Sequence, residues 1–232
     1  MTTRLILTSD GSHTLLNETL NGYYHSVHGA LQESRHIFIN LGLQEAMDRY
    51  LLKANQAPKM LPLTQPPVCI FEMGFGTGLN AVLTWLEAEK MKVPIHYVTI
   101  EAFPIEDEKA QLLNYNGLLN TDRLLELHHT AWEKTVPLSP YFTFEKHLIS
   151  LQEFDTLQSF DAIYYDAFAP SAQPELWTQE IFEKLAGWLK PGGNLTTYCS
   201  KSYVRRHLQA AGLRVEKHPG PPGKREVLRA FL

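Results

Sequence analysis

Three groups of residues are spaced so that they can bind a nucleotide-like ligand and carry out chemistry beside it. The first is a glycine run, Glu72-Met73-Gly74-Phe75-Gly76-Thr77-Gly78-Leu79-Asn80, directly after the apolar segment 68–71. The second and third are acids, Glu101 and Asp166, which each end another apolar segment. A strand followed by a tight glycine turn and a helix is the geometry that places a ligand on a helix N-terminus.

The spacing of the glycines distinguishes between nucleotide-like cofactors. The dinucleotide fingerprint requires G-x-G-x-x-G, but Leu79 stands where its last glycine should be. This departure argues against an NAD- or FAD-dependent oxidoreductase. The run from Glu72 reads instead as E-x-G-x-G-x-G, which fits S-adenosyl-L-methionine better.

Glu101 comes one expected helix and one expected strand after the glycine run. It directly follows the apolar stretch 96–100. An acid at the end of the next strand can accept hydrogen bonds from both hydroxyls of a ribose. The sequence therefore predicts that Glu101 binds the ribose of the cofactor.

Asp166 begins the segment Asp166-Ala167-Phe168-Ala169-Pro170 after a further apolar stretch. This segment resembles the D/N-P-P-aromatic loop of amine methyltransferases without its paired prolines. A carboxylate there can bind an alkylammonium and help to remove its proton, and Phe168 can pack against a cation. The alternative is that Asp166 caps the following helix, but Ser171 is a closer candidate for that position.

The rest of the chain contains elements that would hold these residues. Apolar strands alternate with amphipathic helices from Val68 onward, which predicts a mostly parallel sheet covered on both faces. The last two strands have no helix between them and should pair antiparallel. We predict strands at 68–73, 96–101, 143–147, 161–166, 194–198, 214–218 and 227–231, and helices at 79–91, 105–114, 148–157, 174–189 and 203–211. The fold class is thus α/β, a Rossmann-like sheet of seven strands with an antiparallel last strand.

A small N-terminal elaboration precedes this sheet. Asp10-Gly11 is a strong hairpin turn between two short strands, and a helix is expected near 43–54. The segment 55–67 holds four prolines and is interpreted as a linker. We therefore expect an elaboration over residues 1–60 and a core domain over 61–232.

Composition limits the classes of function. The chain has 232 residues with 44% hydrophobic and 20% charged residues, typical of a globular protein. No apolar stretch reaches the roughly 18 residues of a membrane helix, and no signal peptide is recognisable. Cys69 and Cys199 lack metal-binding spacing, as do the histidines, among which His128 and His129 are interpreted as surface residues. We expect a cytoplasmic protein with no metal site and no membrane partner.

Charge is distributed unevenly along the chain. The net charge is −4, yet eight basic and only two acidic residues lie from Lys201 onward. A basic end on an acidic body favours a polyanionic partner. Arginine and lysine side chains there can bind phosphates, which supply most nucleic-acid affinity.

Together these segments resemble one family, the methyltransferases that make 5-methylaminomethyl-2-thiouridine at the wobble position of tRNA. The resemblance covers nearly the whole chain. Its more specific motifs are Gly-x-x-Glu-Ser-Arg, Asp-x-Phe-Ala-Pro and Lys-Arg-Glu. The matching segments are 24–26, 29–38, 72–80, 100–104, 161–170, 174–178, 190–193, 203–206 and 223–226.

The resemblance implies methylation of the amine of 5-aminomethyl-2-thiouridine at tRNA position 34, with S-adenosyl-L-methionine as cofactor. It assigns catalytic roles to Asp166 and Phe168. It implies cofactor contacts at Glu72, Gly74, Phe75, Gly76, Thr77, Gly78, Asn80, Glu101, Ala102, Phe103 and Asp166. Substrate and tRNA contacts are implied at Ser26, Glu33, Arg35, Arg205, Arg206, Lys224 and Arg225, with the segment 29–35 closing the site.

The sequence departs from the family in two places. An acid that faces the adenine is often found near the end of the fourth strand, where this chain has Phe144-Glu145-Lys146-His147. The bifunctional members continue into a flavin-dependent oxidase, whereas this sequence ends at Leu232, so another enzyme is expected to supply the aminomethyl group. The remaining alternatives are a methyltransferase of the same fold that acts on a small-molecule or protein amine, and a non-catalytic binding module.

Overall fold

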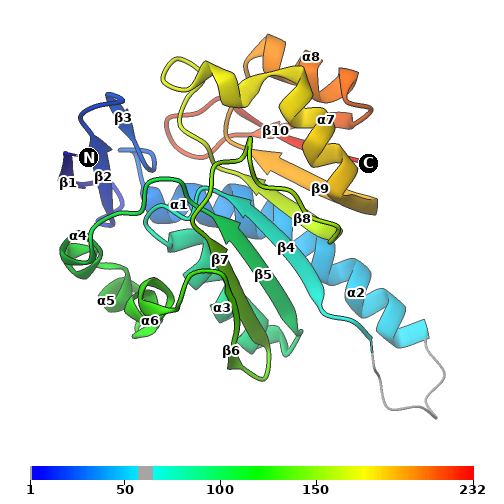
Figure 1. Cartoon of the computed structure of the whole chain (residues 1–232), viewed down its shortest axis with the longest axis horizontal. Helices are drawn as coiled ribbons and strands as arrows, with labels where there is room; N and C mark the ends of the chain where they lie inside the picture. Colours follow the sequence, from blue (N-terminus) through cyan, green and yellow to red (C-terminus); the bar gives the residue numbers. More distant parts are fainter. Residues whose placement is uncertain (1, 57–64) are drawn as a thin grey trace.

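The centre of the molecule is an eight-stranded mixed sheet in the order β10-β11-β9-β8-β4-β5-β7-β6 (Figure 1). The computed structural model describes residues 2–56 and 65–232. Strands β4, β5, β7, β8 and β9 are parallel, while β6 and β11 run antiparallel to their neighbours. The strands are β4 (Val68–Met73), β5 (Ile95–Ile100), β6 (Lys134–Ser139), β7 (Phe142–His147), β8 (Phe160–Tyr165), β9 (Leu189–Thr197), β10 (Arg214–Pro219) and β11 (Glu226–Phe231).

Helices cover both faces of this sheet, and a small second sheet lies beside it (Figure 1). The small sheet consists of β1 (Thr3–Leu7), β2 (His13–Asn17) and β3 (Gly22–Tyr23). The helices are α1 (Ala30–Ser34), the π-helical η1 (Arg35–Leu43), α2 (Gln44–Gln56), α3 (Leu79–Met91), α4 (Asp107–Leu112), α5 (Tyr115–Leu119), α6 (Arg123–His129), the 3-10 turn η2 (Pro174–Trp177), α7 (Gln179–Trp188) and α8 (Ser202–Ala210).

The central strands are apolar on both faces because they are buried from both sides. Alternate residues of β8 point to opposite faces, so Tyr164 packs in the cluster with η1 and α3 while Tyr165 packs in the cluster with α7 and α8. Both rings are 0% exposed. This pattern of continuous burial is what a parallel sheet between two helical layers requires.

The predicted Rossmann-like fold is confirmed, but the number of strands was wrong. The sequence analysis missed β6, which pairs antiparallel with β7 at the edge of the sheet. Pro137 lies within β6 next to an irregularity in the pairing register. Proline lacks an N–H donor and is tolerated on an edge strand, which explains why this segment did not resemble a strand.

One predicted helix is absent. Residues 148–157 form turns rather than a helix. The Ser150 hydroxyl accepts a hydrogen bond from the Glu153 N–H, at 3.3 Å, and itself donates to the Glu153 carboxylate, at 2.7 Å. These bonds close one local turn, which the chain does not continue into a helix. Leu151 and Phe154 of this segment still point into the core, whereas Leu148 and Leu157 are exposed.

The N-terminal elaboration shares its hydrophobic core with the sheet. Leu15, Ile37 and Phe38 belong to the same buried cluster as Ile70 and Tyr97 of the central strands. The proposed division at residue 60 and most of the proline-rich linker lie outside the described residues. Within the described part, the elaboration packs against the sheet through this shared cluster.

The helix η1 lies close against strands β8 and β9. A Cβ atom at Gly42 would come within 3.0 Å of Thr196 Oγ1 and 3.2 Å of Tyr164 Cε1, so only glycine fits without a shift. The Asn194 side chain donates to the Gly42 carbonyl at 3.1 Å. This close approach holds η1 in place against the sheet.

Replacing Phe38 with alanine should lower the free energy of unfolding by about 3–5 kcal/mol. Phe38 is 1% exposed and its ring lies 5.3 Å from that of Tyr164. Denaturant unfolding followed by circular dichroism measures the change. Leu157→Ala is the control, since that side chain is fully exposed and should change stability by less than about 0.5 kcal/mol. Equal effects would show that η1 does not stabilise the fold.

Among residues 2–56 and 65–232, no helix has both the length and the apolar composition needed to cross a membrane.

Candidate functional site

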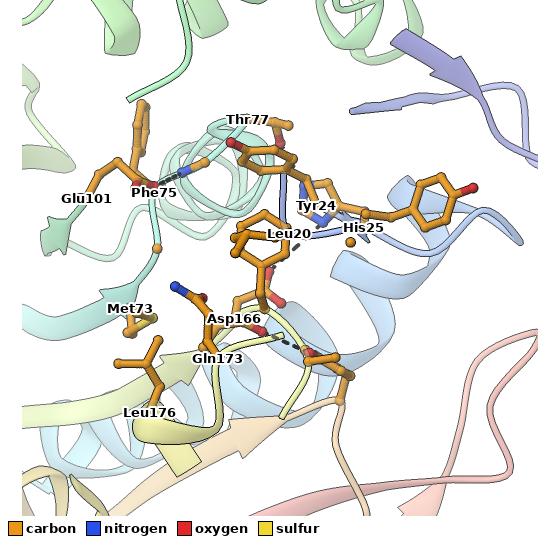
Figure 2. Close-up of a pocket in the computed structure, with 18 of the residues that line it drawn as sticks. Leu20, Tyr24, His25, Met73, Phe75, Thr77, Glu101, Asp166, Gln173 and Leu176 are labelled. Carbon is orange, nitrogen blue, oxygen red and sulfur yellow. Dashed lines mark hydrogen bonds and ion pairs between the residues drawn. The ribbon is translucent and has the colours of Figure 1, made fainter. Parts of the chain in front are cut away.

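A cavity of about 670 Å³ opens at the carboxyl ends of β4, β5 and β8. Met73, Glu101 and Asp166 line it from these strand ends, while Tyr24 and His25 reach in from the N-terminal segment (Figure 2). Ligands of open α/β sheets bind at this position. The volume falls in the range of about 300–1,000 Å³ that is usual for small-molecule sites.

The glycine run forms the floor of the cavity. Gly74, Gly76 and Gly78 all have positive φ, at 90°, 50° and 77°. A Cβ at Gly76 would come within 3.0 Å of the Tyr24 ring. Gly78 is the N-cap of α3 and faces Phe75 and Leu124 rather than the cavity. The turn thus brings backbone close to a ligand above the start of α3.

Glu101 lies at the end of β5 with its carboxylate held by the backbone. Its Oε2 accepts the Gly76 N–H at 3.0 Å, and its Oε1 accepts the Phe103 N–H at 2.9 Å. Burial raises the pKa of Glu101, and these N–H donors partly oppose the shift. Each oxygen keeps a free lone pair, so the carboxylate can accept two ligand hydroxyls. Ala102 and Phe103 also line the cavity.

Asp166 follows β8 and faces the same space (Figure 2). Its Oδ2 accepts a hydrogen bond from Asn80 Nδ2 at 2.9 Å. Burial, followed by the nearby charge of Glu33, raises the pKa of Asp166 to about 8. A carboxyl group with this pKa can hold or release a proton near physiological pH.

Glu72 lies beneath the site rather than in its wall. Its side chain is 0% exposed and accepts the Thr99 hydroxyl at 3.0 Å. Burial, and then the charge of Asp166, raise the pKa of Glu72 to about 8. Among the described residues, Glu72 Oε1 and Asn80 Oδ1 are both buried without a hydrogen-bond partner. The Asn80 amide, which donates to Asp166, also acts on Glu72 and partly opposes the rise of its pKa.

Phe168 lies across the cavity from the glycine turn. Its ring contacts the Tyr24 ring edge-on, with 5.0 Å between centroids. The chain at Gly22 is in close contact with it, because a Cβ there would come within 3.0 Å of the Phe168 ring. The two rings form an apolar, electron-rich wall that suits a cation.

His25 is a neutral group beside Asp166. Its Nε2 is 2.7 Å from the Thr77 hydroxyl, and its Nδ1 is 3.9 Å from Asp166 Oδ2. Burial lowers the pKa of His25 to about 4, so the imidazole is uncharged at neutral pH. It therefore adds no positive charge to the site.

The residues that line the cavity directly after β7, the strand predicted at 143–147, include no acid. Ile149, Ser150, Leu151 and Gln152 line the cavity after β7. Glu145 instead turns along the sheet, where it contacts the side chains of His96, Thr135 and His147. The polar groups available to a ligand's base on this wall are the Ser150 and Gln152 side chains and the backbone.

The structure brings Lys224 to Ser26 and Glu33, which are far from it in the sequence, and all three residues line the cavity. Lys224 Nζ is 2.9 Å from Glu33 Oε1, and Glu33 Oε2 accepts the Ser26 N–H at 2.7 Å. This contact holds the segment after β3 against the loop between β10 and β11.

The other predicted substrate residues do not line the cavity. Arg35, Arg206 and Arg225 are exposed, and Arg205 is half-buried on α8. Arg205 and Arg225 both lower the pKa of Glu226, after the hydrogen bond from Lys217, which places them on the same side of the molecule. The free positive charge of the C-terminal part is smaller than its composition indicates, because four basic residues form ion pairs: Arg214, Lys217, Lys224 and Arg229.

Sequence reasoning missed several residues of the site. Tyr198, at the end of β9, lines the cavity and donates its hydroxyl to the Ala167 carbonyl at 2.8 Å. Its place after an apolar strand is the one indication the sequence offered. His128 was wrongly interpreted as a surface residue, because its ring packs on Phe75 and its Nε2 is 3.1 Å from the Thr77 carbonyl.

No group of three or more His, Cys, Asp or Glu side chains that could hold a metal ion occurs in the described part of the chain.

The arrangement fits S-adenosylmethionine by the groups that it presents. The Glu101 carboxylate can accept ribose hydroxyls, and the glycine turn allows close approach of the backbone. The rings of Tyr24 and Phe168 can face a sulfonium. A glycine turn above a helix N-terminus, an acid at the next strand end and an antiparallel strand inserted at the sheet edge define a Rossmann-like S-adenosylmethionine-dependent methyltransferase.

Comparisons with known proteins agree with this class. A family model described as S-adenosyl-L-methionine-dependent methyltransferase matches residues 127–232. The tRNA 5-methylaminomethyl-2-thiouridine biosynthesis bifunctional protein MnmC of Leptospira borgpetersenii serovar Hardjo-bovis is 31% identical over 226 residues, which are 93% of this chain and 33% of that protein.

Solved structures show the same fold. MNMC2 from Aquifex aeolicus matches with a TM-score of 0.71 and 23% identity over 99% of this chain and 70% of that one. Spermidine synthase from Thermotoga maritima matches with a TM-score of 0.52 and 15% identity, over 98% and 72%.

The chain is therefore similar over nearly its whole length to the methyltransferase part of MnmC proteins, and its fold and site are those of the S-adenosylmethionine-dependent methyltransferases. The predicted cofactor is thereby confirmed. The chain spans about one third of the length of the curated relatives that it matches.

Proposed function

We propose that this protein methylates the primary amine of 5-aminomethyl-2-thiouridine at the wobble position of tRNA. The observation that carries the proposal is Asp166, a buried carboxyl group that faces the cavity beside the glycine turn, with Asn80 bonded to it at 2.9 Å. The name of the MnmC relatives supplies the substrate class. The aminomethyl group must come from a different reaction, because methyl transfer does not create an amine.

The chemistry requires one proton to leave the substrate. Bound S-adenosylmethionine supplies a methyl group activated by a sulfonium sulfur. An alkylammonium has no free lone pair, so Asp166 in its ionised form takes one proton from it. With its proton on Asp166, the nitrogen would have the free lone pair that methyl transfer from the sulfonium requires. The remaining contribution of the protein is to hold the two atoms in line.

The test is to incubate the protein with methyl-labelled S-adenosylmethionine and tRNA that carries the aminomethyl group. Label on the wobble nucleoside is the expected result. Identical tRNA with an unmodified wobble uridine is the control. Transfer to a small-molecule or protein amine with none to tRNA would replace the proposal by the alternative substrate class.

Replacing Arg205 and Arg206 together by glutamine should raise the KM for tRNA by roughly tenfold and leave the Kd of S-adenosylmethionine unchanged. Each phosphate contact that is lost should reduce the slope of log affinity against log salt by about 0.7–0.9. Kinetics at several salt concentrations measure both effects.

Arg214→Gln combined with Lys90→Gln is the matched control because it removes the same two positive charges from residues already paired with Glu216 and Glu87. If the α8 variant and this control behave alike, the start of α8 does not bind phosphate.

A further inference from the structure

The ammonium group of Lys224 occupies a prepared position in the wall of the cavity. Its Nζ is 2.9 Å from Glu33 Oε1 and lies over the Tyr198 ring, 4.9 Å from the centroid. The side chains of Lys224 and Glu33 are 26% and 7% exposed. A carboxylate on one side and an aromatic face on the other are the groups that bind an alkylammonium.

Glu33 is held in place as a cation ligand independently of Lys224. Its Oε2 accepts the Ser26 backbone N–H at 2.7 Å, while its Oε1 meets Lys224. Glu33 itself is 5% exposed. A buried carboxylate needs a positive partner, and among the described lining residues Lys224 is the lysine or arginine that supplies it. His25, one of two histidines in the cavity wall, is neutral because burial lowers its pKa to about 4.

The position is next to the proposed base. The charge of Glu33 raises the pKa of Asp166 and the charge of Lys224 lowers it, so all three groups lie within one electrostatic environment. Tyr198 joins the same region, since its hydroxyl bonds the carbonyl of Ala167, the residue after Asp166.

We propose that Glu33 and the Tyr198 ring form the subsite for the ammonium group of the substrate, and that Lys224 fills this subsite until the substrate displaces it. The inference rests on the proposed function, because an aminomethyl substrate is a primary alkylammonium like the end of a lysine side chain. Glu33 then anchors the ammonium while Asp166 accepts its proton.

The loop that carries Lys224 is placed for such an exchange. Lys224 lies between β10 and β11, in a segment held by two contacts to the N-terminal part. His36 Nε2 is 2.7 Å from the Pro219 carbonyl, and Gly223 packs directly on the His28 ring. These contacts keep the loop at the cavity when the ion pair opens. A displaced Lys224 joins the exposed Arg225 at the rim, where a tRNA phosphate can bind both.

The experiment measures binding of 5-aminomethyluracil to the protein saturated with S-adenosylhomocysteine, by titration calorimetry. The neutral isostere 5-hydroxymethyluracil is the ligand control. Lys224→Gln should bind the amine about fivefold more tightly than the unaltered protein, because the competing internal cation is gone. Glu33→Gln should bind it at least about tenfold more weakly. Neither variant should change binding of the hydroxymethyl compound.

Lys217→Gln is the matched control, since it breaks an exposed ion pair with Glu226, 2.8 Å long, away from the cavity. It should leave amine binding unchanged. The double variant Glu33→Gln with Lys224→Gln removes both charges and leaves no unpaired buried group. It should bind S-adenosylhomocysteine normally and still lose the amine.

Weaker or unchanged amine binding by Lys224→Gln would overturn the inference, as would an unaltered affinity in the double variant. Absence of amine binding to both the unaltered protein and Lys224→Gln would overturn it as well, even if tRNA is methylated. Conversely, the binding pattern expected here without methylation of tRNA would retain the ammonium subsite and reject the proposed function.

Discussion

Replacing Asp166 by asparagine is expected to lower kcat for tRNA methylation by roughly 10²–10⁴-fold, the contribution of a positioned proton acceptor. Asparagine keeps the shape of the side chain and can still interact with Asn80, but it cannot take a proton from the ammonium. The Kd of S-adenosylmethionine should change little, because the proposed ribose contacts belong to Glu101, at the end of a different strand. Single-turnover kinetics and calorimetry measure the two quantities separately.

The pH dependence of kcat/KM provides a second readout of the same variant. Burial, and then the charge of Glu33, raise the pKa of Asp166 to about 8. Below that pH the carboxyl group is protonated and cannot accept a proton, so kcat/KM should rise as pH increases through about 8. This rise should disappear in Asp166→Asn. The pKa of the substrate amine contributes equally to both profiles and cancels in their ratio.

Asp161→Asn is the matched control for this experiment. Asp161 lies in the same strand at its opposite end, where its carboxylate accepts the Cys69 N–H and pairs with Lys190, both at distances under 3 Å. It should affect stability without changing the pH profile. If Asp166→Asn abolishes cofactor binding instead, the residue belongs to the cofactor site and another group removes the proton.

The parts of the site that could be predicted from the sequence are those encoded locally. The glycine run specifies its own turn, because three positive φ values near one helix start are accessible to glycine. Glu101 and Asp166 follow apolar strands, and parallel strands bring their carboxyl ends to one edge of the sheet. Their proximity therefore follows from the alternation of strands and helices.

The parts that could not be predicted depend on contacts between distant segments. Nothing near Glu33 indicates that Lys224 will neutralise it, and nothing near Glu72 indicates that it is buried beneath Asn80. Arg214 and Lys224 look equivalent in a basic tail until the fold gives each its own acidic partner. The sequence shows which side chains carry charge, but burial decides which of those charges remain free to bind a partner.

Replacing Glu101 by alanine is expected to raise the Kd of S-adenosylmethionine by about 10²-fold or more. The proposed role gives this carboxylate two hydrogen bonds to the ribose, and each hydrogen bond to a charged group contributes about 1.5–3 kcal/mol. The change also leaves the Gly76 and Phe103 N–H groups without their acceptor, so the glycine turn loses its attachment to β5. Calorimetry with S-adenosylhomocysteine, which carries the same ribose, avoids any dependence on turnover.

Two further variants distinguish the ribose contact from general damage to the cavity. Glu101→Gln keeps an oxygen acceptor on an uncharged side chain, so its Kd should fall between those of the unaltered protein and Glu101→Ala. Glu145→Gln makes the same change on neighbouring β7, where the carboxylate faces His96 and His147 rather than the cavity, and should leave the Kd unchanged.

At saturating cofactor, Glu101→Ala should regain most of its kcat, because Asp166 and the ammonium subsite remain intact. A large loss of kcat with an unchanged Kd would instead place Glu101 on the side of the reacting amine and leave the ribose without its proposed partner.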